Sequence, residues 1–370
     1  MFIFVSGKQS NTRKQTRLRK LFLYSIFLVN ALAAFALGLS YLSIYINPEK
    51  SWIPALFGLA YPYILTLNIA FVIFWVVFKY RYAILSLAFI LLGIFQLGNY
   101  FRFSGTESGN TDFRVTSYNV KYFSGSKEDR LPGRAEEILS FLKEKNADII
   151  CLQEISLNNR KLFDIMKVKD ELPRIKHLQF AHTSQSGGLV TLTLYPIIDM
   201  GEIRFEKSGN MVIYTDLQIN KDTVRVYNCH LQSYRLRPDD IQPLDSLTFA
   251  NRREGLKGLK SVSGKVKSAF VKRAKQAVQL GEHIAQSPYP VIVCGDFNDT
   301  PVSFTYRMVK GNLKDAFIES GSGFGNTYNG WLPSFRIDYV LHSAHYKGYN
   351  FTVDHVDFSD HFPVTCDFVQ

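Results

Sequence analysis

Three long stretches without a charged residue lie near the N-terminus of the 370-residue chain, at 21–46, 54–78 and 83–101. A helix needs about 20 apolar residues to cross roughly 30 Å of hydrocarbon, and a helix without a polar face has no side to present to water. We therefore predict a membrane domain of three transmembrane helices within residues 1–103. A short polar linker rich in turn-forming residues follows at 104–112.

Basic residues are distributed unevenly around these stretches. Six precede the first stretch, and Lys79 and Arg81 lie between the second and third, whereas Lys50 is offset by Glu49 between the first and second. Cytoplasmic loops carry the excess of Lys and Arg in membrane proteins. We therefore expect a multi-pass plasma (inner) membrane protein with a cytoplasmic N-terminus. Three spans would place the remaining domain on the extracytoplasmic side.

The net charge of +11 belongs mostly to this N-terminal part. Residues 1–103 hold ten Lys or Arg against one acidic residue, which leaves only +2 for the rest of the chain. Nucleic-acid-binding domains are identified by a basic excess on the domain itself. The high overall charge is therefore no argument for nucleic acid binding.

The four cysteines lie in apolar segments at positions 151, 229, 294 and 366. Their wide spacing matches no zinc-ligand pattern. Free cysteine is among the most frequently buried residue types, so we expect four small core residues.

From residue 114 onward, short apolar strands alternate with helical stretches, which is typical of a layered α/β or α+β domain. Several of these strands end in acidic, amide or imidazole side chains. Each has a structural explanation when taken alone, such as a turn cap. Together they favour attack on a phosphoester, because carboxylates hold hard cations and activate water, while imidazoles stabilise phosphoryl oxygens. The strand-end residues are Asn119, Glu154, His230, Asp296, Asn298, Asp338, Asp360 and His361.

Six segments in order resemble the endonuclease/exonuclease/phosphatase superfamily, which includes DNase I-like nucleases, abasic-site endonucleases, inositol polyphosphate phosphatases and neutral sphingomyelinases. The resemblance implies an α+β fold at 113–370, a four-layer α/β/β/α sandwich of the DNase I-like type, with the site at one edge. The segments are Ser117-Tyr-Asn119-Val, Leu152-Gln-Glu154, Asn228-Cys-His230-Leu-Gln-Ser233, Gly295-Asp296-Phe-Asn298-Asp-Thr-Pro301, Arg336-Ile-Asp338-Tyr-Val340 and Ser359-Asp360-His361-Phe-Pro363-Val364.

The resemblance also implies roles for these residues. Glu154 is expected to be the principal ligand of Mg²⁺, or of Mn²⁺ as the alternative, with Asn119 and Asp360 near the ion. Asp296 is expected to orient or activate the attacking water, and Asn298 to hold that water and contact phosphate.

Two histidines are expected to face the scissile phosphate. His361 would do so with Asp338 as its orienting carboxylate, and His230 would be the second. No carboxylate partner for His230 can be identified from the sequence. Arg336 is assigned, together with Asn298, to substrate binding.

Two further segments bear on the substrate. Residues 187–196 fit the family's middle strand pair but lack the Ser-Lys/Arg that commonly precedes Tyr-Pro there. Residues 252–275 carry a local charge of +8, and the later part is predicted to form an amphipathic helix. This basic segment fits contact with anionic lipid headgroups, contact with a nucleic acid backbone, or a solvated helix face.

The sequence thus predicts a membrane-anchored, divalent-metal-dependent phosphoester hydrolase in which water attacks a phosphodiester or phosphomonoester. Nuclease, phospholipid phosphodiesterase and phosphatase activities all stay open, so the expected partners are a bilayer and a nucleic acid, phospholipid or small phosphate ester. The alternative is a catalytically inactive binding or scaffold member of the same fold. That alternative would be indicated by loss of the acidic and histidine residues, all of which are present.

Overall fold

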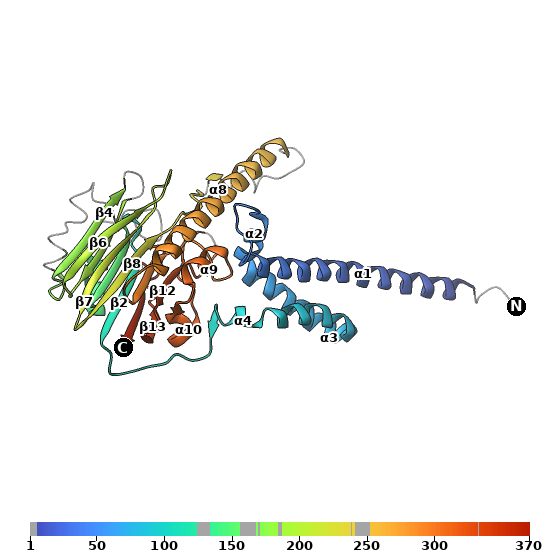
Figure 1. Ribbon diagram of the computed structural model, residues 1–370. Coiled ribbons are helices and arrows are strands. Elements are labelled where there is room, and N and C mark those ends of the chain that lie inside the picture. Colours follow the sequence, from blue (N-terminus) through green and yellow to red (C-terminus); the bar gives the residue numbers. More distant parts are fainter. Residues whose placement is uncertain are drawn as a thin grey trace.

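Two six-stranded sheets pack face to face, and long N-terminal helices extend away from them (Figure 1). The computed structural model describes residues 6–123, 134–155, 168, 171–183, 187–237, 239–240, 252–331 and 333–370. Neighbouring strands are antiparallel except for the pairs β2–β3 and β8–β9, which are parallel. Both sheets are therefore mixed.

The first sheet has the order β10-β12-β9-β8-β7-β6 and the second β13-β14-β2-β3-β5-β4. The first comprises β6 (Ile197–Arg204), β7 (Met211–Ile219), β8 (Asp222–His230), β9 (Val291–Asp296), β10 (Lys314–Asp315) and β12 (Asp338–His342). The second comprises β2 (Phe113–Asn119), β3 (Ile149–Ile155), β4 (His177–Thr183), β5 (Gly187–Thr193), β13 (Lys347–Val353) and β14 (Val364–Val369). Short elements between them are η1 (Lys121–Phe123), α9 (Phe304–Lys310), α10 (Ala316–Ser320) and the paired β1 (Phe101–Arg102) and β11 (Gly323–Phe324).

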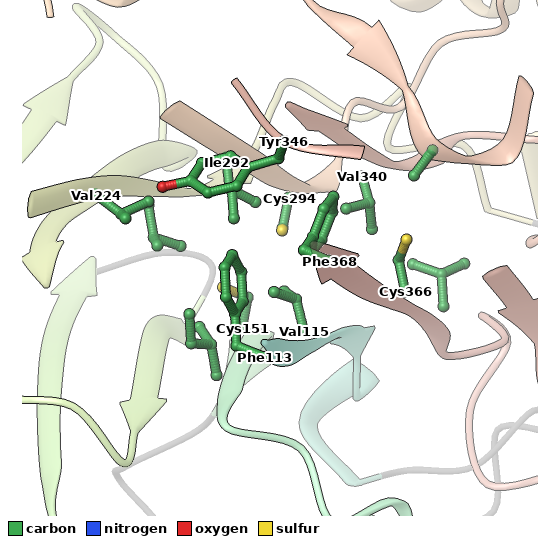
Figure 2. Close-up of a cluster of buried hydrophobic side chains, with 14 of the residues drawn as sticks. Phe113, Val115, Cys151, Val224, Ile292, Cys294, Val340, Tyr346, Cys366 and Phe368 are labelled. Atoms are coloured by element: carbon green, nitrogen blue, oxygen red, sulfur yellow. The ribbon is translucent and has the colours of Figure 1, made fainter. Parts of the chain in front are cut away.

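The layer between the sheets is apolar. Phe113 and Cys151 from the second sheet face Ile292 and Cys294 from the first (Figure 2). Alternate side chains of a strand point to opposite faces, so each strand buries one row here. All four cysteines are free and buried, which confirms their predicted place in the core.

A helix covers the outer face of each sheet. The apolar side of α5 (Arg134–Lys145) joins residues of β2 and β3 in one buried cluster. The helix α8 (Arg252–Ala285) buries Ala277 and Leu280 against β8 and β9. The predicted four-layer α/β/β/α sandwich is therefore confirmed, and the basic segment 252–275 lies on α8.

The N-terminal part contains α1 (Ser6–Leu42), α2 (Ile53–Leu59), α3 (Tyr61–Leu92) and α4 (Ile94–Leu97). Among the described residues, two helices are long and apolar enough to cross a membrane, Arg17–Leu42 and Tyr61–Leu92. The prediction of three such helices is therefore wrong. The expected third span, 83–101, is divided at Gly93 and adds only a few helical residues beyond it.

The kink at Lys79 (φ −159°, ψ 81°) explains this difference. It divides α3 into two arms, and both arms pack along α1. Trp75 and Tyr82 lie on either side of the kink, and both rings contact Phe27 of α1. Residues 80–92 alone span only about 20 Å at 1.5 Å per residue, less than the thickness of the hydrocarbon core.

The N-terminal helices contact the sandwich at residues 300–302, just after the turn that follows β9. The Ser43 hydroxyl donates to the carbonyl of Val302 (2.7 Å), and the Thr300 hydroxyl donates to the carbonyl of Gly58 (3.3 Å). The side chain of Val302 is buried among apolar residues of α1 and α3. A Cβ at Gly58 would lie 2.4 Å from the Val302 carbonyl oxygen, so this close approach requires glycine.

We therefore expect Gly58→Ala to separate α2 from the 300–302 segment. Forcing an extra methyl group into a packed contact costs about 1–3 kcal/mol, so the melting temperature of the full chain in detergent should fall. Gly109→Ala is the matched control, because nothing lies within 4 Å of a Cβ added there. Equal melting temperatures for the two variants would show that the Gly58 contact does not hold the parts together.

Candidate active site

Three neighbouring strands of the first sheet place three predicted site residues side by side. Asp296, the last residue of β9, is in register with His230 of β8 on one side and with Asp338 of β12 on the other. Residues in register on adjacent strands project from the same face. The first sheet alone therefore assembles two carboxylates and an imidazole.

The second sheet supplies Asn119 and Glu154 from the ends of β2 and β3. Glu154 has a left-handed backbone (φ 55°), and the β3–β5 register shifts around it, between Leu152 and Ile155. Such irregularities re-aim a side chain at the end of a strand. Asp360 and His361 lie just before β14, where the Ser359 hydroxyl donates to the carbonyl of Asn119 (2.8 Å).

Asp296 is the centre of this arrangement. Its carboxylate is buried, and its Oδ2 accepts from the side-chain amides of Asn119 and Asn298, each at 3.0 Å. Its Oδ1 accepts from the backbone N–H of Asn298 (2.7 Å). Burial is the main cause that raises the pKa of Asp296 to about 7, and the neighbouring Asp338 raises it further. A carboxyl with this pKa can accept a proton near neutral pH.

His361 forms an ion pair with Asp338, since its Nδ1 lies 2.9 Å from Oδ2 of that residue. Burial lowers the pKa of His361, but the Asp338 and Asp296 carboxylates outweigh burial and hold the pKa well above its usual value. The His361 ring is therefore an imidazolium. Its Nε2 lies 3.8 Å from Oδ2 of Asp296.

His230 has the opposite protonation state. Burial, reinforced by the charge on His361, lowers the pKa of His230 to about 3, so the ring is neutral. Its Nε2 is buried and makes no hydrogen bond, although Oε1 of Glu154 lies 3.4 Å away and Oδ2 of Asp296 3.9 Å away. Glu154 and Asp296 are thus close to His230, but neither is hydrogen-bonded to its Nε2.

Glu154 and Asp360 fit a hard divalent cation. Burial raises the pKa of Glu154 to about 7, and the next cause is the negative charge of Asp360. The two carboxylates therefore repel each other, and a bound cation would relieve that repulsion. Asn119 fits less directly, because its Nδ2 points toward Glu154 (3.4 Å) while its Oδ1 accepts from the backbone N–H of Lys121 (3.1 Å).

A second group, Asp296, Asp338 and His361, also brings possible ligand atoms within 4.8 Å of one another. A histidine must be neutral to bind a metal, whereas the Asp338 and Asp296 carboxylates raise the pKa of His361 and so favour its charged form. This group is better described as a buried ion pair beside a carboxyl.

A cavity of about 510 Å³ opens over these residues. Glu154, Asp296, Asn298, Asp360 and His361 line it. The lining also includes apolar residues of α2 and the first turn of α3. The N-terminal helices therefore form part of the candidate active site.

Arg336, which the sequence assigned to substrate binding, lies elsewhere. Its guanidinium is buried, donates to both carboxylate oxygens of Asp315 and stacks on the rings of Phe317 and Tyr339. Arg336 therefore forms a structural ion pair with Asp315 and does not line the cavity.

The sequence reasoning missed two basic residues near the cavity. Lys121 contacts Asp360, with Nζ 2.9 Å from Oδ2, and Arg235 lines the cavity. Their positions, two residues after Asn119 and five after His230, are the only signal that could have identified them.

A model of the Endonuclease/Exonuclease/phosphatase family matches residues 116–361. The chain belongs to this family. The model of a domain of unknown function (DUF8431) matches residues 19–100, the N-terminal helices. No curated protein matches the chain.

Solved structures share the fold of this family member at low sequence identity. A humanized D. rerio TDP2 has a TM-score of 0.50 and 16% identity, over 70% of this chain and 99% of that one. A mannosyl-6-phosphatase from Bacteroides thetaiotaomicron has a TM-score of 0.48 and 17% identity, over 70% and 100%. The human Nocturnin catalytic domain has a TM-score of 0.48 and 20% identity, over 70% and 93%. The family match and the TDP2 structure together show a phosphoesterase-type fold for this part of the chain.

The two arginines should behave differently when replaced. Arg336→Met would leave the Asp315 carboxylate buried without its partner, and breaking such a pair costs about 3–5 kcal/mol, so the melting temperature should fall by many degrees. Arg235→Met, on the exposed side of the cavity, should change stability by no more than about 0.5 kcal/mol. Comparable melting temperatures for both variants would contradict the structural role of Arg336.

Proposed function

We propose that this family member is a membrane-anchored, Mg²⁺-dependent hydrolase of phosphoesters. The observation that carries the proposal is the pairing of opposite protonation states in one cavity. A carboxyl that can accept a proton, Asp296, lies 3.8 Å from an imidazolium, His361, that can stabilise negative charge. Pairs of titratable groups whose surroundings push their pKa values apart are typical of acid–base catalytic sites.

In this proposal Asp296 orients the attacking water and accepts its proton. The amides of Asn119 and Asn298 fix the carboxylate, and Asn298 is itself fixed because its amide also donates to the Leu231 carbonyl (2.9 Å). A fixed base needs no reorganisation when the water attacks.

His361 contacts the nonbridging oxygens of the phosphate and stabilises their charge in the transition state. Asp338 keeps the ring charged and holds its orientation through Nδ1. His230 is neutral, so in this scheme it donates or accepts a hydrogen bond and adds no charge.

Glu154 and Asp360 would hold Mg²⁺ or Mn²⁺, with Asn119 orienting Glu154. When bound, such an ion neutralises phosphate charge and stabilises the leaving oxygen. The oxygen-rich donor set favours these hard ions over zinc.

The proposed test uses the full chain in detergent with bis-p-nitrophenyl phosphate. We expect turnover with Mg²⁺ that a chelator abolishes, and a fall in kcat of about 10²- to 10⁴-fold in Asp296→Asn, since the amide cannot accept the proton. Asp199→Asn on the exposed strand β6 is the matched control and should keep wild-type turnover. Turnover that resists the chelator, or a wild-type kcat in Asp296→Asn, would contradict the proposal.

We also propose that α1 crosses the membrane once and that α3 enters it and returns as a hairpin bent at Lys79, which leaves the catalytic domain on the extracytoplasmic side. The returning arm of α3 runs back along α1, since Ser86 donates to Asn30 and Tyr41 donates to the carbonyl of Phe89. In support, Tyr61 at the start of α3 lies near the sandwich, whereas Lys79 lies at the kink near the distal part of α1. Arg17, Arg19 and Lys20 also belong to the distal end of α1, which points away from the sandwich (Figure 1). Basic residues thus gather at the end that faces the cytoplasm in this topology.

Reporter fusions after Gln370 would test this topology in a bacterial host. Alkaline phosphatase, which requires export, should be active there, and green fluorescent protein exported in the unfolded state should be dark. A fluorescent fusion with inactive phosphatase would place the domain in the cytoplasm.

A further inference from the structure

The lining of the active-site cavity is chemically mixed. Besides the carboxylates and the imidazolium, it includes the aliphatic side chains of Leu56, Leu59, Leu236 and Val266. Leu56 and Leu59 come from α2, between the two candidate membrane helices, and Val266 comes from α8. A charged phosphate gains no free energy from contact with an aliphatic surface, whereas an apolar group is stabilised by such contact. Such a lining suits a ligand that carries both a phosphate and an apolar group.

Exposed apolar side chains also surround the place where the helices meet the sandwich. Phe324 of β11 contacts Phe101 of β1, just after the N-terminal helices, and Trp331 lies in the loop that reaches the cavity. Aromatic residues of this kind are enriched at membrane–water interfaces.

The first turns of α8 also carry exposed apolar side chains. Leu256 and Leu259 are half exposed and alternate with Lys257 and Lys260. In Figure 1, α8 projects from the sandwich on the side where α2 lies. An apolar stripe beside basic residues is typical of a helix that lies in the headgroup layer. The helix that supplies Val266 to the cavity thus also carries residues suited to a membrane surface.

Resting on the proposed hydrolase function, we propose that the substrate is a membrane lipid phosphoester. Its phosphate lies among Asp296, His361 and the metal ligands, and its hydrocarbon chain lies against Leu56, Leu59 and Val266. A nucleic acid fits less well, because single-strand channels line the backbone with basic side chains. Among the described residues that line this cavity, Arg235 is the one Lys or Arg.

The test varies only the tail of the substrate. Alkyl p-nitrophenyl phosphates with ethyl, butyl, hexyl and octyl chains share the same scissile bond and release the same nitrophenolate. They are given to the full chain in phosphatidylcholine nanodiscs with Mg²⁺. Full burial of one methylene increases binding about fourfold, so partial burial should raise kcat/KM at least about tenfold from ethyl to octyl.

Partition of long chains into the nanodisc would raise kcat/KM for any membrane-bound enzyme, so variants provide the decisive comparison. Leu59→Gln and Val266→Gln place an amide in the aliphatic wall from two different helices and should reduce the octyl-to-ethyl ratio at least about fivefold. Ile53→Gln is the matched control, because Ile53 lies on the same helix α2, is exposed and does not line the cavity. It should keep the wild-type ratio.

The outcomes separate the two proposals. Turnover of the ethyl ester with no dependence on chain length would overturn the lipid assignment and leave the hydrolase intact. A wild-type octyl-to-ethyl ratio in all three variants would also overturn the lipid assignment, because the dependence on chain length would then come from partition alone. Faster hydrolysis of a single-stranded oligonucleotide than of the octyl ester would assign a nucleic acid instead. No turnover of any ester would overturn the hydrolase and the lipid assignment together.

Discussion

The buried Asp296 carboxylate depends on groups that only the complete sandwich brings together. Burial disfavours its charged form, and two side-chain amides, one backbone N–H and a nearby imidazolium compensate. Asn119 belongs to one sheet and Asp296 to the other. The apolar layer between the sheets therefore determines the distance between Asn119 and Asp296. A shift of either sheet would leave a buried polar group without its partner.

The turn after β9 connects Asp296 to the residues that contact the N-terminal helices. The chain leaves Asp296, passes Asn298 and reaches Thr300 and Val302, which contact α2 and α1. Residues of α2 also line the cavity. A fragment that begins at the sandwich would keep the proposed catalytic groups but lose this part of the lining, so we expect substrate preference to depend on the full chain more than the proposed chemistry does.

Much of the site was predictable because its residues lie at or beside strand ends in short motifs. Asn119, Glu154, His230, Asp296, Asn298, Asp338, Asp360 and His361 all gather as expected. Arg336 was misplaced because the motif Arg-Ile-Asp does not reveal that Asp315, 21 residues earlier, pairs with the arginine. The three membrane helices were overcounted because absence of charge shows where a helix is apolar, but not that the second and third segments join at Lys79 and that the third breaks at Gly93.

By itself, the sequence determined the identity of the strands, the apolar N-terminal part and the chemical groups at the strand ends, because alternation, charge and short motifs are local properties. Only the tertiary structure decided the protonation states and the shape of the cavity. His230 and His361 are both buried histidines of the same site, yet burial leaves one neutral while Asp338 and Asp296 keep the other charged. Likewise, no local pattern shows that α2 and α8 line one cavity, because their residues lie about 200 positions apart in the chain.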